Sequence, residues 1–206
     1  MQKIAQDAEY FLNFQTQTGW GRVLSRFRDW ANPQHGWLTL DVGCGPGLMP
    51  ALLAQRDCYS FGIDIDLLMF LPTPLHQQVA AADVMHLPFP DQIFDLITAS
   101  NLLFLLPDPL AALGAMRRLL CPGGHIAILN PSERLTVAAA TKFIEARNLT
   151  GLARETLLNW AARSEAHFHW TEVESADLFA AAEIEWIETH TIMGPGFARL
   201  VRGIRV

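Results

Sequence analysis

The sequence predicts an α/β protein with one open sheet, mostly parallel, covered by helices on both faces. Strand-like and helix-like segments alternate from residue 37 to residue 131, and a glycine-rich turn at residues 43–47 joins the first strand to a helix. After a helix-rich stretch, two last strands are joined by a short turn at residues 194–196. Strands joined by a tight turn are antiparallel. We therefore expect a doubly wound sheet of seven strands that ends in an antiparallel hairpin.

Apolar runs mark the predicted strands, and apolar residues spaced at the helical period mark the helices. In chain order these are helices at residues 2–14 and 21–30, a strand at 37–42, a helix at 48–55, and strands at 59–64, 78–82 and 94–99. Asp108 and Pro109 then begin a helix, because aspartate caps free N–H groups and proline fits the first helical position. The run Cys-Pro-Gly-Gly at residues 121–124 is expected to stop this helix before a fifth strand at 125–130.

The alternation ends after the fifth strand. Residues 131–166 contain helical segments with no strand between them, and a further helix at 176–182 precedes strands at 183–193 and 197–206. We expect one domain over residues 1–206. Its parts are an N-terminal helical cap at 1–31, a binding core at 37–131, a helical insertion at 132–168, and a C-terminal helix and hairpin at 171–206. The insertion is expected to cover the carboxyl edge of the sheet.

Composition excludes several classes of function. A net charge of −6 argues against a general affinity for nucleic acid, which needs a basic face. The two lysines, Lys3 and Lys142, lie away from any predicted site, which argues against Schiff-base chemistry. Cys44, Cys58 and Cys121 form no CxxC pair, so we expect no metal site and a reducing, cytoplasmic environment. No apolar stretch approaches the roughly 20 residues that span a membrane. The oligomeric state stays open.

The glycine turn, Leu-Asp-Val-Gly-Cys-Gly-Pro-Gly at residues 40–47, limits the ligand. A P-loop is excluded because no Gly-Lys-Ser/Thr follows. A dinucleotide-binding turn needs GxGxxG, but here Leu48 stands at the third glycine. Pro46 also removes one amide donor that a pyrophosphate would use. The turn therefore favours a bulky ligand that is less anionic than a diphosphate.

Three carboxylates follow the predicted strands. Asp41 stands just before the turn, where it would repel a pyrophosphate and attract an ammonium group. Asp64 ends the second strand, where a carboxylate can accept hydrogen bonds from both ribose hydroxyls. Asp83 follows the third strand and could accept from an exocyclic amine. Ammonium, ribose and aminopurine together describe S-adenosylmethionine.

Four ordered stretches resemble the class I S-adenosylmethionine-dependent methyltransferases, in particular the small-molecule type that acts on quinones and sterols. They are the glycine turn at residues 40–47, Gly-Ile-Asp-Ile-Asp at 62–66, the run at 81–109 that contains Leu-Pro-Phe-Pro-Asp, and Arg-Leu-Leu-Cys-Pro-Gly-Gly at the start of 118–131. The resemblance implies a Rossmann-like fold with an antiparallel last strand, and S-adenosylmethionine as the cofactor, released as S-adenosylhomocysteine.

The resemblance also implies a role for individual residues. The methionine part of the cofactor would lie against Asp41, Gly43, Cys44, Gly45 and Gly47. Asp64 would hold the ribose, with Ile65 packed on the adenine. The adenine edge would meet Asp83 and the Val84 amide, and Ser100 and Asn101 would lie beside the sulfonium. Tyr10 and Thr18, near the N-terminus, are further candidate contacts.

The acceptor is not defined by any motif. The stretch Ala-Ser-Asn-Leu-Leu-Phe at residues 99–104 differs from the Asn-Pro-Pro-Tyr/Phe of amino-group methylases acting on nucleic acid and glutamine. Phe, Trp, Leu and Ala in the N-terminal helices and the insertion favour a small apolar or aromatic acceptor. No catalytic base is identified. The rival interpretations are a catalytically silent binding or regulatory module, a protein methyltransferase and a nicotinamide oxidoreductase.

Overall fold

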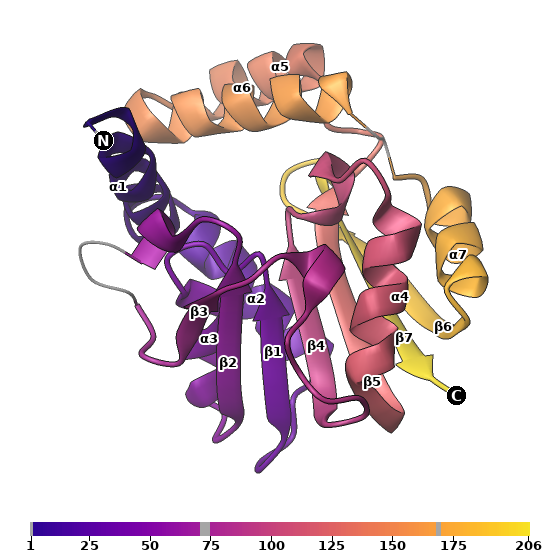
Figure 1. The fold of residues 1–206 in the computed structure, drawn as a ribbon. Coiled ribbons are helices and arrows are strands. Elements are labelled where there is room, and N and C mark those ends of the chain that lie inside the picture. Colours follow the sequence, from indigo (N-terminus) through magenta and orange to yellow (C-terminus); the bar gives the residue numbers. More distant parts are fainter. Residues whose placement is uncertain (1, 71–74, 168–169) are drawn as a thin grey trace.

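The computed structural model describes residues 2–70, 75–167 and 170–206. Its centre is a seven-stranded sheet in the order β3-β2-β1-β4-β5-β7-β6 (Figure 1). The strands are β1 (Leu38–Val42), β2 (Tyr59–Asp64), β3 (Val79–Ala81), β4 (Phe94–Ser100), β5 (Leu120–Pro131), β6 (Ile184–Ile192) and β7 (Ala198–Arg205). β7 runs antiparallel to both of its neighbours, β5 and β6. The predicted doubly wound fold with a C-terminal antiparallel hairpin is confirmed.

Helices cover both faces of the sheet. They are α1 (Gln2–Gln17), α2 (Trp20–Ala31), α3 (Leu48–Ala54), α4 (Pro109–Leu119), α5 (Val137–Arg147), α6 (Gly151–Ala166) and α7 (Glu172–Ala181), with 3₁₀ turns η1 (Leu67–Phe70), η2 (Val84–His86) and η3 (Leu103–Leu105). α2 and α3 pack on one face around Phe27 and Leu53. α4 and α7 pack on the other face around Met116 and Phe179. The alternating strand residues therefore supply two separate cores.

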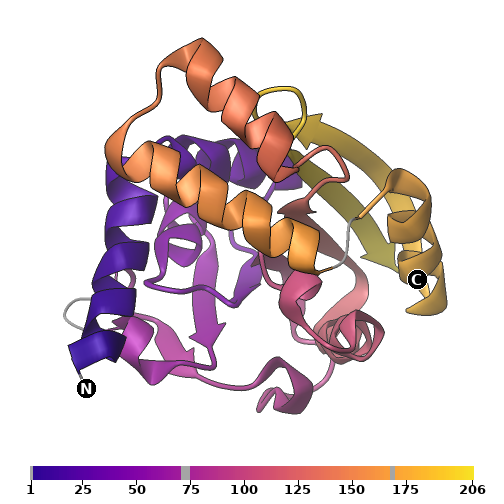
Figure 2. The same cartoon turned by 90° about the horizontal axis from the view of Figure 1, so that it is seen from above.

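The parallel strands bring distant residues to one edge. β1 pairs with β2 on one side and with β4 on the other, so the ends of these strands lie side by side. α5 and α6, the predicted insertion, cross above this carboxyl edge, and α1 stands beside them (Figures 1 and 2). The last residue of the predicted insertion, 168, lies outside the described residues. The edge is where ligands bind in open α/β sheets.

The prediction that the Cys-Pro-Gly-Gly run ends α4 is wrong. The helix ends at Leu119, and β5 already begins at Leu120, so the Cys-Pro-Gly-Gly run lies inside a strand. The pairing with β4 shifts register between Phe94 and Leu96, which takes up the irregular backbone. Gly123 has a φ of 78°, a conformation that suits glycine in such a bulge. The Asp108 cap is confirmed, because its carboxylate accepts from the Ala111 N–H at 2.9 Å.

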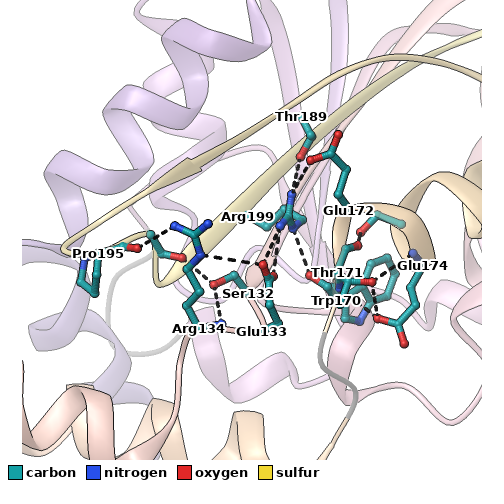
Figure 3. Close-up of polar contacts among 12 residues, drawn as sticks. Ser132, Glu133, Arg134, Trp170, Thr171, Glu172, Glu174, Thr189, Pro195 and Arg199 are labelled. Atoms are coloured by element: carbon teal, nitrogen blue, oxygen red, sulfur yellow. Dashed lines mark hydrogen bonds and ion pairs between the residues drawn. The ribbon is translucent and has the colours of Figure 1, made fainter.

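Both ends of the α5–α6 insertion are tied to β7 by one buried arginine (Figure 3). The Arg199 guanidinium donates to both carboxylate oxygens of Glu133 at 3.0 Å, just after β5. It also donates to the Trp170 carbonyl at 3.0 Å, just before α7. The Arg199 side chain is only 5% exposed, so its contacts are shielded from water. This clamp fixes where the insertion leaves and rejoins the sheet.

We predict that Arg199→Ala lowers the free energy of unfolding by about 3 kcal/mol, because it removes the clamp and leaves the Glu133 carboxylate without its buried partner. Arg134→Ala is the matched control, since Arg134 approaches the same carboxylate at 3.9 Å from an exposed position. Its cost should stay at about 0.5 kcal/mol. Urea denaturation of the variants measures both values. Equal losses in the two variants would contradict a special role for Arg199.

Candidate functional site

The glycine turn between β1 and α3 has a backbone conformation that residues with a side chain rarely adopt. Gly43 has a φ of 73° and Gly47 a φ of 92°, both in the left-handed region. A Cβ on Gly43 would lie 3.2 Å from the Leu102 side chain, and one on Gly47 would lie 3.3 Å from the His76 backbone nitrogen. The turn thus needs its glycines for conformation and for close packing.

Asp64 holds this turn in place. The Gly45 N–H donates to Asp64 Oδ2 at 2.8 Å, and the Asp66 N–H donates to Oδ1 at 3.0 Å. The Gly43 and Cys44 N–H groups both donate to the Ile63 carbonyl, at 2.8 and 2.9 Å. The carboxyl ends of β1 and β2 are therefore locked together. Each Asp64 oxygen can accept one more hydrogen bond from a ligand.

Asp41 lies under the turn and is only 1% exposed. The Thr98 hydroxyl donates to its Oδ1 at 2.6 Å. Its Oδ2 is buried and has no hydrogen-bond partner among the described residues. Burial raises the pKa of Asp41 to about 8, which the Thr98 hydrogen bond opposes and the nearby Asp64 charge reinforces. A buried oxygen in this state calls for a proton or a donor.

The Cys44 side chain, which belongs to the turn, is also buried and lies against Gly62 of β2. Burial, followed by the charges of Asp41 and Asp64, raises the pKa of its thiol. The thiol stays protonated at neutral pH, and only a thiolate is a competent nucleophile. Cys44 therefore packs the back of the turn and is no candidate for covalent chemistry.

The residues predicted to meet the adenine lie further out along the same edge. Asp83 caps η2, and its carboxylate accepts from the Met85 N–H at 2.9 Å. Val84 is buried, whereas Ile65 is 73% exposed. An exposed isoleucine beside the Asp64 carboxylate is available to pack on a ligand ring. The structure thus brings Asp41, the turn and Asp64 into one tight cluster, with Ile65 and Asp83 at its outer margin.

Ser100 ends β4 at the same edge, and Asn101 follows it. Asn101 has a φ of 55°, and its N–H donates to the Leu129 carbonyl at 2.7 Å. Its Oδ1 accepts from the Trp160 indole N–H of α6 at 3.0 Å. The sequence analysis did not predict a role for Trp160. No local pattern indicates a contact between Trp160 and Asn101, because the two residues lie far apart in the chain. This hydrogen bond joins the insertion to the predicted cofactor edge.

A cavity of about 340 Å³ lies between α1 and α2 on one side and α5 and α6 on the other. Most of its lining is apolar. The lining residues are Phe14, Thr18, Gly19, Trp20, Arg22, Val23, Phe143, Leu149, Ala153, Thr156, Leu157, Trp160 and Met193. Trp20 and Trp160 meet edge to face, with ring centroids 5.3 Å apart. Its volume is within the range of small-molecule sites, roughly 300–1,000 Å³.

The cavity adjoins the glycine turn through two elements. Phe14 of α1 lines the cavity, while the neighbouring Gln15 reaches within 3.6 Å of where a Gly45 Cβ would stand. Trp160 lines the cavity and donates to Asn101 at the end of β4. Thr18, a candidate cofactor contact, lines the cavity, and its hydroxyl donates to the Phe14 carbonyl. The cavity and the carboxyl edge are thus adjacent compartments.

Known proteins share this architecture. Residues 40–128 match the family described as a methyltransferase domain. The ubiquinone biosynthesis O-methyltransferase of Pseudomonas paraeruginosa is 31% identical over 122 residues, which cover 53% of this chain and 52% of that protein. The segment at residues 40–128 is thus similar to methyltransferase domains, in the part of the chain that carries the glycine turn and Asp64. It spans about half the length of the curated relatives it matches.

Solved methyltransferase structures match the fold over nearly the whole chain. A chain in the complex between the Haloferax volcanii Trm112 methyltransferase activator and a methyltransferase is 16% identical, with a TM-score of 0.72 and coverage of 97% of this chain and 95% of that one. The magnesium protoporphyrin IX methyltransferase from Synechocystis PCC 6803 with bound SAH is 15% identical, with a TM-score of 0.61 and coverage of 100% and 87%. At these low sequence identities, the likeness shows a shared fold and nothing about function. Among the described residues, no helix has the length and apolarity to cross a membrane.

We predict that the stability of this protein falls as pH rises from about 4 to about 8. The Asp41 pKa rises from 3.8 to about 8 on folding, so between these values the folded state holds a proton that the unfolded state has lost. The Asp41→Asn variant cannot ionise and should lose this contribution to the pH dependence, which urea denaturation at pH 5 and pH 8 would reveal. Parallel pH profiles for the two proteins would contradict a buried, protonated Asp41.

Proposed function

We propose that this protein is an S-adenosylmethionine-dependent methyltransferase that methylates a small, mainly apolar or aromatic acceptor. The observation that carries the proposal is the buried, unpartnered Oδ2 of Asp41 beside the glycine turn and Asp64. A cofactor with an ammonium group would provide the missing donor, which a pyrophosphate could not do. The acceptor would occupy the cavity beneath α5 and α6.

The residues at the carboxyl edge fit the cofactor in three parts. Asp41 and the backbone of the turn would receive its methionine end, since the glycines leave room for close approach. The free acceptor capacity of Asp64 would take the ribose hydroxyls. Ile65 and Asp83, the exposed apolar and acidic groups at the margin, would meet the adenine. Ser100 and Asn101 would then border the sulfonium side.

When bound, S-adenosylmethionine would supply an activated methyl group for transfer to a lone pair of the acceptor, with S-adenosylhomocysteine as the second product. The protein's part is alignment and exclusion of water, which can supply much of the rate enhancement. Trp160 fixes α6 against Asn101, so it sets the position of the cavity relative to the cofactor edge. Among the described residues that line the cavity there is no histidine or carboxylate. A general base for a hydroxyl acceptor would thus have to come from outside this lining.

The named relatives favour a small molecule as the acceptor. The matched Pseudomonas proteins are ubiquinone biosynthesis O-methyltransferases, and their similarity covers about half of this chain. The cavity, built by α1, α2, α5 and α6, draws mostly on segments outside the residues 40–128 that match the family. We therefore expect this protein to share its cofactor with the relatives. Its acceptor is more free to differ from theirs.

We predict that the protein binds S-adenosylhomocysteine and that Asp64→Asn weakens this binding by roughly tenfold or more, since a hydrogen bond to a charged group is worth about 1.5–3 kcal/mol. Asp66→Asn is the matched control, because it removes the same charge two residues away and keeps an oxygen for the Leu68 N–H. Isothermal titration calorimetry measures all three proteins. No binding by the unaltered protein would favour a silent module, and preference for NADH would favour an oxidoreductase.

We predict methyl transfer from labelled S-adenosylmethionine to a member of a panel of quinols, phenols, fatty acids and amines, and none to protein or nucleic acid. Apolar members with an aromatic ring should react best, because Trp20, Trp160 and Phe143 supply flat apolar surface. Scintillation counting of extracted product measures turnover. Turnover confined to a protein substrate would support a protein methyltransferase and overturn the small-molecule proposal.

A further inference from the structure

The lining of the apolar cavity contains one charged side chain, and the described residues provide no hydrogen-bond or ion-pair partner for it. Its polar lining consists of Thr18, Thr156 and Arg22. The Thr18 hydroxyl donates to the Phe14 carbonyl, and the Thr156 hydroxyl donates to the Leu152 carbonyl at 2.8 Å. Both hydroxyl protons are therefore used in hydrogen bonds to carbonyls of α1 and α6. Among the described residues of the lining, Arg22 is the only charged one, and its guanidinium has no hydrogen-bond or ion-pair partner there.

Arg22 differs from most arginines of the fold. The guanidinium groups of Arg28, Arg56, Arg117, Arg118, Arg134, Arg199 and Arg202 each approach a carboxylate, and that of Arg205 donates to backbone carbonyls. Within the described part of the chain, the Arg22 side chain has no such partner. Its Nη2 lies 3.3 Å from where a Gly19 Cβ would stand, so it folds back over the α1–α2 turn. The missing side chain at Gly19 leaves space for the cation at the cavity.

The electrostatic environment of the cavity favours an anion. No aspartate or glutamate lines it among the described residues, although the chain carries a net charge of −6. A cation next to an apolar wall attracts a counter-ion more strongly than one surrounded by water, because the wall lowers the local dielectric constant. A guanidinium also offers paired donors that match a carboxylate. The cavity therefore combines an apolar chamber with one cationic side chain, the exposed Arg22.

We propose that the cavity binds an amphipathic acid, with a flat apolar or aromatic body in the chamber and one anionic group held by Arg22. The proposal rests on the proposed function only in taking this acid to be the methyl acceptor. The body would lie against Trp20, Trp160 and Phe143, and the anionic group would lie at the α1–α2 turn. Arg22 thus acts as a specificity-determining residue, which distinguishes the acid from its neutral analogue.

Two fluorescent probes with the same ring system test this proposal. 8-Anilinonaphthalene-1-sulfonate carries an anionic group, and N-phenyl-1-naphthylamine is its neutral counterpart. Both are titrated into the full chain, with excitation of tryptophan, because Trp20 and Trp160 lie in the cavity wall. We expect Arg22→Gln to weaken sulfonate binding by about 3- to 10-fold and to change binding of the neutral probe by less than about 2-fold. Arg22→Lys, which keeps the charge, should restore most of the sulfonate affinity.

Two further variants complete the test. Arg26→Gln is the matched control, because Arg26 is exposed on the same helix, lacks a partner in the described residues and does not line the cavity. It should leave both probes unaffected. Ala153→Phe fills the cavity from α6 and should abolish binding of both probes. Equal effects of Arg22→Gln and Arg26→Gln, equal losses of both probes in Arg22→Gln, or sulfonate binding that survives Ala153→Phe would each overturn the proposal.

Calorimetry with S-adenosylhomocysteine separates this proposal from the proposed function. Arg22→Gln should bind S-adenosylhomocysteine as the unaltered protein does, since Arg22 lines the cavity and the cofactor edge is formed by other residues. If the unaltered protein binds no S-adenosylhomocysteine but discriminates between the probes through Arg22, the methyltransferase function fails and the acid-binding cavity stands. If the unaltered protein binds S-adenosylhomocysteine but does not discriminate between the probes, the acid-binding proposal fails and the methyltransferase function stands.

Discussion

The hydrogen bond from the Gly45 N–H to the Asp64 carboxylate holds together the two strand ends on which the site is built. Gly45 belongs to the turn after β1, and Asp64 ends β2, so this 2.8 Å contact adds to the two N–H bonds to the Ile63 carbonyl that join the same strand ends. The same bond leaves each Asp64 oxygen with capacity for a ligand. Rigidity and binding capacity therefore come from one side chain. Asp41, buried behind the turn, adds the oxygen that only a donor or a proton can satisfy.

The helical insertion depends on this edge for its own position. Arg199 clamps its two ends to β7 (Figure 3). The Trp160 indole N–H fastens its second helix to Asn101 after β4. Trp160 also packs against all three hydrophobic clusters of the described chain. Trp160 therefore connects the cavity wall to Asn101, which borders the predicted sulfonium position.

The carboxyl edge and the cavity differ in the polarity and charge of the groups that they present to a ligand. The carboxyl edge is rich in carboxylates and backbone donors, whereas the cavity is apolar with the Arg22 cation at its turn. A sulfonium ligand suits the first environment and an apolar acid suits the second, so each compartment disfavours the other's ligand. The family match lies over the first compartment, at residues 40–128. The chain's own specificity is therefore expected to reside in α1, α2, α5 and α6.

The sequence by itself determined the elements with local signals: the glycine turn, the Asp108 cap and the parallel alternation, because spacing and side-chain type act over a few residues. It also placed Asp41, Asp64 and Ser100 at one sheet edge, since parallel strands end together. Only the tertiary structure decided that β7 lies between β5 and β6, that Trp160 binds Asn101 and that Arg22 lines a cavity. These features join residues distant in the chain, and burial such as that of Asp41 depends on packing from several elements at once, which no local pattern encodes.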